Sequence, residues 1–515
     1  MDKTKKRFDK YNISEAVIFF AGAFLRIFRL GTLPSGVYID EPPMAYSAWC
    51  IANYGVDRYL RHMPVYFQNW YSGQSPMYTY LLALLYKLRA PMGNAAVIRL
   101  PACFFGILML FLVYFTVKEL TTNGHIRFFA LFCTAFCPYF VMQSRLGLDC
   151  NLLLFWSMFS LLFLIRYCKG GKLSDLVICG VLFGLSLYTY ALSYILLGIF
   201  LVLAALYLLR TKKIDVKRTL LWAVIVVAVS LPVILFAISV VLRLPEYSFL
   251  GFTVAPVSSG RLSELSGKNF IKNAILSLWA AMTHDDHYAL TVDEFSTLYY
   301  ISIPFVIVGA CVSIVNFVKS AAKKEFCFDG LFVLFALSNA VVGGMNGEVL
   351  VYRINAVFAA YLYFLVKGVY VSVGAIKKEP VKKAAGAVLA LIYAGFAFMF
   401  VGFYFSCYTR AYDGFTHSAS DAIGFARENE PGMTVYVDYM GLSELLLWEE
   451  PISPYEWNES ETVNGVVPKI PEEFDIGAGY IIRKSDSFNR EKILGSGTDI
   501  RTYEFEDYAL FIIDR

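Results

Sequence analysis

The chain has 515 residues, of which 58% are hydrophobic and only 17% are charged, and its mean hydropathy is +0.56. This composition excludes a soluble globular domain and indicates a protein that crosses a membrane several times. The apolar runs are about 18 to 25 residues long and do not alternate polar and apolar side chains, so they predict helices and not the strands of a barrel.

Eleven apolar segments predict a mainly α, polytopic bundle of membrane-spanning helices. The first follows a basic N-terminus and lacks a small-residue cleavage site, so we expect it to remain as an uncleaved span. The run from Asp175 to Arg210 is too long for one helix, and we divide it at "YTYALSY". The predicted spans are 15–33, 96–118, 126–143, 150–168, 173–190, 192–209, 218–243, 297–319, 328–344, 350–374 and 384–406.

Basic residues mark one side of the membrane. They gather at the N-terminus and in the loops "KELTTNGHIR", "RYCKGGK", "RTKKIDVKR", "VKSAAKKEF" and "KKEPVKK", which all fall on the same side if there are eleven spans. Short cytoplasmic loops carry an excess of Lys and Arg. We therefore expect a multi-pass protein of the cell membrane with a cytoplasmic N-terminus and an extracytoplasmic C-terminus.

This topology divides the chain into a membrane domain, residues 1–408, and an extracytoplasmic domain, residues 409–515. Two further extracytoplasmic segments, 34–94 and 244–296, lie within the membrane domain. The tail from 409 has 21 acidic and 9 basic residues, whereas the remainder has 36 basic and 20 acidic residues. Alternating segments such as "MTVYVDY", "GYIIRK" and "YALFIID" predict strands, and "SASDAIGFARENEPG" predicts a helix, so we expect a small α/β domain. Its charge is of the wrong sign for holding a phosphate, and we expect it to be dispensable for any chemical step.

The stretch "GVYIDEPPMAYSAW" places Asp40 and Glu41 shortly after the first span. Carboxylates beside a bilayer are costly unless they have a partner or a function. Asp40 could act as a general base whose loop is fixed by Pro42 and Pro43. The alternative is an acid that caps a helix starting near Met44.

An aromatic segment, "YGVDRYLRHMPVYFQNWYSGQSPMYTYLLALLYKL", follows in the same extracytoplasmic region. Aromatic residues concentrate at the level of the lipid headgroups, either as a simple belt or in helices that lie along the membrane. Such a segment could cover a lipid-borne substrate. Within it we single out Tyr66 and Gln74 as candidate site residues.

Two arginines lie at the outer ends of predicted spans. Arg145 precedes Asp149 by four residues, a spacing that would allow an ion pair on a helix, but an outer arginine also suits bidentate phosphate binding. Arg353 follows the glycine-rich stretch "VVGGMNGEVLVY" and either faces a cavity or extends to the headgroups.

The stretch "MTHDDHYALTVDE" contains four potential metal ligands in a row: His284, Asp285, Asp286 and His287. Adjacent residues do not point at one centre without a special turn, so a charged loop is the simpler interpretation. We expect no cofactor, and a divalent metal has no further support from the sequence.

The order of these motifs resembles the GT-C membrane glycosyltransferases, and most closely glycosyltransferase family 39, which includes protein O-mannosyltransferases and aminoarabinose transferases. The similar stretches are "YIDEPPMAYSA", "PVYFQNWYSGQSPMYTYLLALLYKL", "VIRLPACFFGIL", "MQSRLGLDCN", "GLSLYTYALS" and "NGEVLVYRINAVFAAY".

The resemblance implies that the protein transfers a hexosyl or pentosyl group from a polyprenyl-phosphate donor to an extracytoplasmic lipid, wall polymer or protein. It implies that Asp40 is the catalytic base, with Glu41 at a paired position, and that Arg145 and Arg353 lie near the donor phosphate. Asp149 stands where many members have a different acid or polar residue. One protein base acting opposite the phosphate would invert the anomeric carbon.

The expected partners are therefore the lipid-borne donor, its acceptor and membrane lipids, and not nucleic acid. The tail matches no eukaryotic lectin-like module and has no cysteine, which favours a bacterial envelope protein. Two other functions remain open: a transporter or flippase of lipid-linked saccharides, and a non-catalytic envelope-assembly protein. A transporter would be expected to carry charges near the bilayer midplane or repeated halves, and the sequence displays neither.

Overall fold

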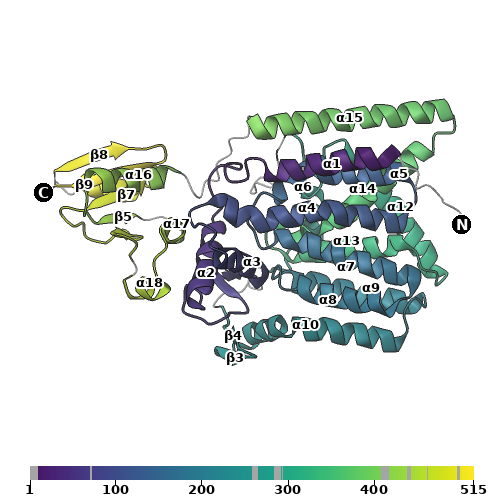
Figure 1. Ribbon diagram of the computed structural model, residues 1–515, viewed down its shortest axis with the longest axis horizontal. Helices are drawn as coiled ribbons and strands as arrows, with labels where there is room; N and C mark the ends of the chain where they lie inside the picture. Colours follow the sequence, from purple (N-terminus) through teal and green to yellow (C-terminus); the bar gives the residue numbers. More distant parts are fainter. Residues whose placement is uncertain are drawn as a thin grey trace, which may run out of the picture.

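A computed structural model describes residues 10–69, 72–257, 265–283, 292, 294–406, 417–437, 442–460, 462–495 and 499–514. A bundle of long helices occupies one part of the molecule, and a small domain containing a sheet lies beyond one end of it (Figure 1). The bundle helices are α1 (Lys10–Ile27), α4 (Ala95–Leu120), α5 (Gly124–Phe136), α6 (Pro138–Gln143), α7 (Asn151–Gly170), α8 (Leu173–Ser186), α9 (Ser193–Arg210), α10 (Val216–Leu242), α12 (Ser302–Ala322), α13 (Phe328–Met345), α14 (Val357–Gly374) and α15 (Glu379–Ser406).

Each of the eleven predicted spans contains a helix in this structure. Among the described residues, eight helices are long and apolar enough to cross a membrane, so the chain is a multi-pass membrane protein. Of the other three, α1 carries three charged residues, α8 has 14 residues, and the predicted span 126–143 is divided into α5 and α6. The division falls at Pro138, which has no N–H to donate and therefore favours the first turn of a new helix.

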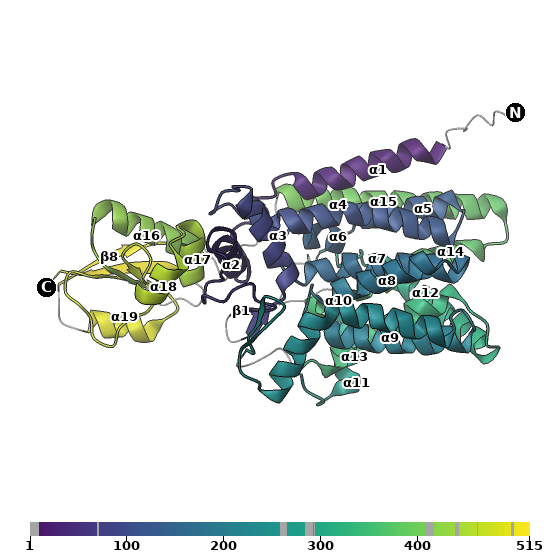
Figure 2. The same cartoon turned by 60° about the horizontal axis from the view of Figure 1, so that its bottom comes forward.

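The described part of residues 34–94, predicted to be extracytoplasmic, is folded and lies at the end of the bundle nearest the sheet (Figures 1 and 2). It contains α2 (Glu41–Tyr54), α3 (Pro76–Lys87) and an antiparallel hairpin of β1 (Phe67–Asn69) and β2 (Ser72–Gln74). A second hairpin, β3 (Tyr247–Phe249) and β4 (Phe252–Val254), packs against it, with the N–H of Val65 donating to the carbonyl of Thr253 at 2.9 Å. Helix α11 (Phe270–Ala280) follows β4 along the chain, and the short 3₁₀ helix η2 (Val351–Ile354) follows α13.

The tail forms a mixed sheet with the strand order β6-β5-β7-β9-β8 in its described part. β5 is parallel to both β6 and β7, whereas β9 is antiparallel to β7 and β8. The predicted small α/β domain is confirmed. Its elements are α16 (His417–Asn429), β5 (Val435–Val437), α17 (Leu442–Glu449), α18 (Pro454–Ser460), β6 (Val466–Val467), β7 (Gly479–Arg483), α19 (Ser487–Leu494), β8 (Ile500–Glu504) and β9 (Tyr508–Ile513).

The tail packs firmly against the segment 34–94. Leu446 and Trp448 of α17 belong to the same buried hydrophobic cluster as Tyr46 of α2 and Tyr86 of α3. The Tyr46 hydroxyl also donates to the carbonyl of Ile452 at 3.0 Å. Helix α17 therefore rests on α2, as both views of the ribbon show (Figures 1 and 2).

The arrangement yields a topological prediction. Asn53 in α2 and Ser460 in α18 are exposed and lie at the sheet end of the bundle, whereas Thr122, between α4 and α5, is exposed at the other end. On a cysteine-free background, Asn53→Cys and Ser460→Cys should react with an impermeant thiol reagent on intact cells, and Thr122→Cys should react only after permeabilisation. The reverse pattern would invert the orientation that we infer from the basic loops.

Candidate active site

Asp40 lies immediately before α2 and is held by two side chains of the β1–β2 hairpin. The Asn69 Nδ2 donates to Asp40 Oδ1 at 3.1 Å, and the Gln74 Nε2 donates to the Asp40 backbone carbonyl at 2.9 Å. Side chains two apart along a strand share a face, and the hairpin register places both amides on the same face. Asp40 is half-buried, so its carboxylate is both anchored and close to the surface of the site.

The alternative interpretation, in which the Asp40 side chain caps α2, is wrong. Asp40 occupies the N-cap position, but its backbone has helical torsion angles and its side chain makes no capping hydrogen bond. The helix also begins at Glu41 and not near Met44. Pro42 and Pro43 fit within its first turn because the N–H groups of that turn need no helical acceptor.

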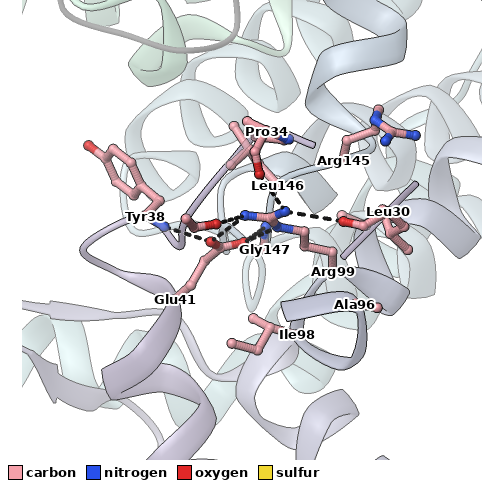
Figure 3. Close-up of polar contacts among 12 residues, drawn as sticks. Leu30, Pro34, Tyr38, Glu41, Ala96, Ile98, Arg99, Arg145, Leu146 and Gly147 are labelled. Carbon is pink, nitrogen blue, oxygen red and sulfur yellow. Dashed lines mark hydrogen bonds and ion pairs between the residues drawn. The ribbon is translucent and has the colours of Figure 1, made fainter. Parts of the chain in front are cut away.

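Glu41 is fully buried and forms an ion pair with Arg99 of α4, which is also fully buried (Figure 3). The two carboxylate oxygens lie 3.1 Å and 3.3 Å from Nε and Nη2 of Arg99, and they also accept hydrogen bonds from the N–H groups of Tyr38 and Gly147 at 2.7 Å and 2.8 Å. A Cβ at Gly147 would lie 2.7 Å from Ile98 Cγ2, so only glycine allows this approach. Glu41 is therefore a structural junction and not a neighbour that shares the chemistry of Asp40.

Arg99 was not among the predicted site residues. Its remaining donors bind the carbonyls of Leu30, Pro34 and Gly36 at 2.6–3.1 Å, so it fastens the turn after α1 to α4 (Figure 3). The sequence does carry a signal for it, because an arginine near the start of an apolar span rarely lacks a specific partner.

Arg145 is also fully buried, and its position argues against the expected role at a phosphate. Its Nη1 and Nη2 atoms donate to the carbonyls of Leu25, Arg26, Arg29 and Leu33 at 2.6–3.1 Å. These carbonyls lie at the C-terminal end of α1 and the turn beyond it, where helical partners are missing. The alternative interpretation of Arg145, a helical i,i+4 pair with Asp149, is wrong because residues 144–150 are not helical.

Asp149, Gln74 and Tyr66 connect the hairpin to the bundle. Asp149 Oδ2 accepts a hydrogen bond from the N–H of Ser75 at 2.8 Å and is buried. The Tyr66 hydroxyl donates to the carbonyl of Gly73 at 3.0 Å, and its ring stacks on Phe236 of α10 with centroids 4.3 Å apart. These contacts fix the place of the hairpin that holds Asp40.

Arg353 lies in η2 and is only 8% exposed. The segment that contains it approaches Asp149. Asn355, two residues later, donates from Nδ2 to the carbonyl of Cys150 at 2.6 Å. A continuous series of contacts thus leads from Asp40 through Gln74, Ser75 and Asp149 to the segment of Arg353. The structure brings these residues to one end of the bundle, where Arg145 is buried against the turn after α1.

The four potential metal ligands of the sequence, His284 to His287, lie outside the described residues. Within the described ranges, no group of three or more His, Cys, Asp or Glu side chains is arranged to hold a metal ion.

Comparisons with known proteins agree with this architecture. Residues 73–236 match the family described as dolichyl-phosphate-mannose-protein mannosyltransferase. No curated protein sequence matches the chain.

Solved structures are similar over most of the chain. The apo oligosaccharyltransferase of Archaeoglobus fulgidus is 15% identical with a TM-score of 0.58; the match covers 91% of this chain but 65% of the archaeal one, so this chain spans just under two thirds of its length. ArnT from Cupriavidus metallidurans bound to undecaprenyl phosphate is 13% identical with a TM-score of 0.55, and the match covers 97% of both chains. The chain therefore has the GT-C fold and resembles glycosyltransferase family 39.

The burial of Glu41 changes what its substitution should do. Glu41→Gln removes the charge that compensates Arg99, and breaking one side of a buried ion pair typically costs about 3–5 kcal/mol. We expect a large fall in the thermal unfolding temperature of the purified protein. Glu379→Gln is a suitable control, because the ion pair of Glu379 with Lys382 is exposed and should contribute little. Equal unfolding temperatures for the two variants would contradict the junction role of Glu41.

Proposed function

We propose that the chain is a membrane glycosyltransferase that moves a sugar from a polyprenyl-phosphate donor to an extracytoplasmic acceptor. The observation that carries the proposal is the half-buried Asp40 at the end of a GT-C bundle, whose carboxylate accepts a hydrogen bond from Asn69 and whose backbone carbonyl accepts one from Gln74. A base that accepts a proton must be held in one position relative to the reacting hydroxyl. The hairpin and the first turn of α2 supply that rigidity.

An apolar groove that could hold a polyprenyl chain supports the proposal that the sugar donor is lipid-linked. It has a volume of about 530 Å³ and is formed by α9, α10 and the turn before α9. Its lining is almost entirely apolar: Leu187, Tyr194, Gly198, Leu201, Val226, Ser230, Val233, Ile234, Ala237, Ile238, Val241 and Leu242.

The groove adjoins the segments that hold Asp40. The N–H of Met77, at the start of α3, donates to the carbonyl of Tyr188 at 3.1 Å, and Tyr66 stacks on Phe236 of α10. A lipid lying in the groove would therefore present its phosphate near the β1–β2 hairpin. That ArnT has been solved with undecaprenyl phosphate is consistent with a donor of this class.

The proposed reaction needs one base and one cation from the chain. Asp40 takes the proton from the acceptor hydroxyl. The oxygen of the acceptor forms the new bond to the anomeric carbon, and the bond from that carbon to the phosphate oxygen breaks. Polyprenyl phosphate leaves with the electron pair. Arg353, whose planar guanidinium can form two hydrogen bonds to a phosphate, stabilises the departing charge. Attack opposite the phosphate inverts the anomeric carbon.

The first prediction of this mechanism concerns Asp40. Asp40→Asn keeps the shape but removes the base, so we expect transfer to fall by about 10²–10⁴-fold while donor binding and thermal stability persist. Transfer from radiolabelled polyprenyl-phosphate sugars by the purified protein would measure this. Asp421→Asn, on the exposed face of α16, is the matched control and should be fully active. Full transfer by folded Asp40→Ala would refute Asp40 as the base.

The second prediction concerns Arg353. Arg353→Lys keeps the charge but loses the planar fork, so donor affinity should fall by about 10-fold, the effect of one lost hydrogen bond to a charged group. Binding of polyprenyl phosphate by titration calorimetry would measure it. Arg243→Lys, at the exposed end of α10, should bind normally. Unchanged affinity in Arg353→Lys would reduce Arg353 to an interfacial anchor.

The same assays separate the two alternative functions. Movement of a lipid-linked saccharide across vesicles without loss of sugar from the lipid would favour a flippase. If the protein neither transfers sugar from any donor nor moves any lipid-linked saccharide, the result would favour an assembly protein.

A further inference from the structure

Four side chains form a hydrogen-bonded series from the C-terminal domain to Asp40. Glu444 of α17 binds Arg58, with Oε1 and Nη1 3.0 Å apart. Arg58 Nη2 donates to Asn69 Oδ1 at 3.3 Å, and Asn69 Nδ2 donates to Asp40 Oδ1 at 3.1 Å. The series joins residues 40 and 444, which are far apart in the chain.

The middle of the series is buried and tightly held. Arg58 and Asn69 are each 3% exposed. Arg58 also donates to the backbone carbonyl of Gln68 at 3.1 Å, and its own carbonyl accepts from Asn458 Nδ2 at 2.8 Å. Burial alone would lower the pKa of Arg58, but the carboxylate of Glu444 and further nearby groups outweigh it, so the pKa lies above its usual value and the guanidinium stays charged.

This chemistry fixes the orientation of the Asn69 amide. Arginine can only donate and an ionised carboxylate can only accept, so the amide oxygen must face Arg58 and the amide NH₂ must face Asp40. If Arg58 were displaced, the amide could rotate and present its oxygen to the carboxylate, which would repel it. The orientation of Asp40 therefore depends on Arg58, and the charge of Arg58 is balanced by Glu444.

We propose that Glu444 and Arg58 are positioning residues that act on Asp40 through Asn69, so that a docked C-terminal domain is required for full activity. The proposal rests on the proposed function, because it assigns the domain a role in holding the proposed base. It also replaces the expectation that the tail is dispensable for the chemical step. That expectation rested on the acidic charge of the tail and the lack of a recognisable donor site in it. Neither feature indicates that one carboxylate of the tail balances a buried arginine of the segment 34–94.

The test compares variants of the full-length protein in proteoliposomes, with hydrolysis of a panel of undecaprenyl-phosphate hexoses and pentoses as the assay. Glu444→Ala and Asn69→Ala should each lower kcat by about 10-fold with little change in KM, since both act on the orientation of the base and not on the donor. Glu444→Gln, which can still accept a hydrogen bond from Arg58, should show a smaller fall in kcat than Glu444→Ala. The double variant should be no slower than Asn69→Ala alone, because both changes break the same series.

Tyr46→Phe is the matched control. It removes a hydrogen bond between the tail and α2 without touching the series, so it should keep normal kcat even if its unfolding temperature falls. A parallel loss of kcat in Tyr46→Phe would mean that docking strength alone matters and would overturn the proposal. A normal kcat in folded Glu444→Ala would also overturn the proposal. The same holds if the fold-losses in kcat of Glu444→Ala and Asn69→Ala multiply in the double variant.

Including Asp40→Asn separates this proposal from the one on which it rests. If Asp40→Asn is inactive and Glu444→Ala is normal, only the positioning role fails. If no donor is hydrolysed, or Asp40→Asn is fully active, the proposed function itself fails and the positioning role with it.

Discussion

The buried ion pair between Glu41 and Arg99 is the interaction on which the geometry of the candidate site depends. One carboxylate joins the start of α2, the start of α4 and the turn at Gly147, while the guanidinium binds three carbonyls of the turn after α1. Two charges removed from water are tolerated only because nearly every donor and acceptor is satisfied. Since Asp40 directly precedes Glu41, the ion pair also fixes the backbone position of the proposed base.

Buried arginines are used repeatedly to bind the ends of helices in this protein. Arg145 binds carbonyls at the end of α1, and Arg26 binds carbonyls of Gly22, Thr134 and Phe140 at 2.7–3.0 Å. In a membrane, carbonyls at an irregular turn cannot rely on water, so a guanidinium with five donors is an effective substitute. The role of an arginine at the end of a span is therefore ambiguous in sequence. Arg145 binds the carbonyls that end α1, whereas Arg353 lies in η2, close to Asn355, which binds the carbonyl of Cys150 next to Asp149.

Much of the fold could be read from the sequence because membrane helices and basic loops follow strong physical rules. Long apolar runs located a helix in each of the eleven predicted spans, and alternation located three strands of the tail. The division at Pro138 was missed because an apolar run does not reveal a local break. The partners of Glu41, Arg145 and Asp149 could not be predicted, since each lies in contact with residues that are distant in the chain. Asp40 was singled out by its neighbours in sequence, but Asn69 and Arg58 give no comparable local signal.

Residue 40 thus links three features of the molecule: the bundle through Glu41, the hairpin through Asn69 and Gln74, and the tail through Arg58 and Glu444. We propose that it is the one base of an inverting sugar transfer. The most direct measurement is the anomeric configuration of the product, determined by NMR after transfer from a polyprenyl-phosphate sugar of known configuration. We expect inversion at the anomeric carbon, because the acceptor would attack opposite the departing phosphate. A product with retained configuration would require a second group on the opposite face of the sugar and would contradict it.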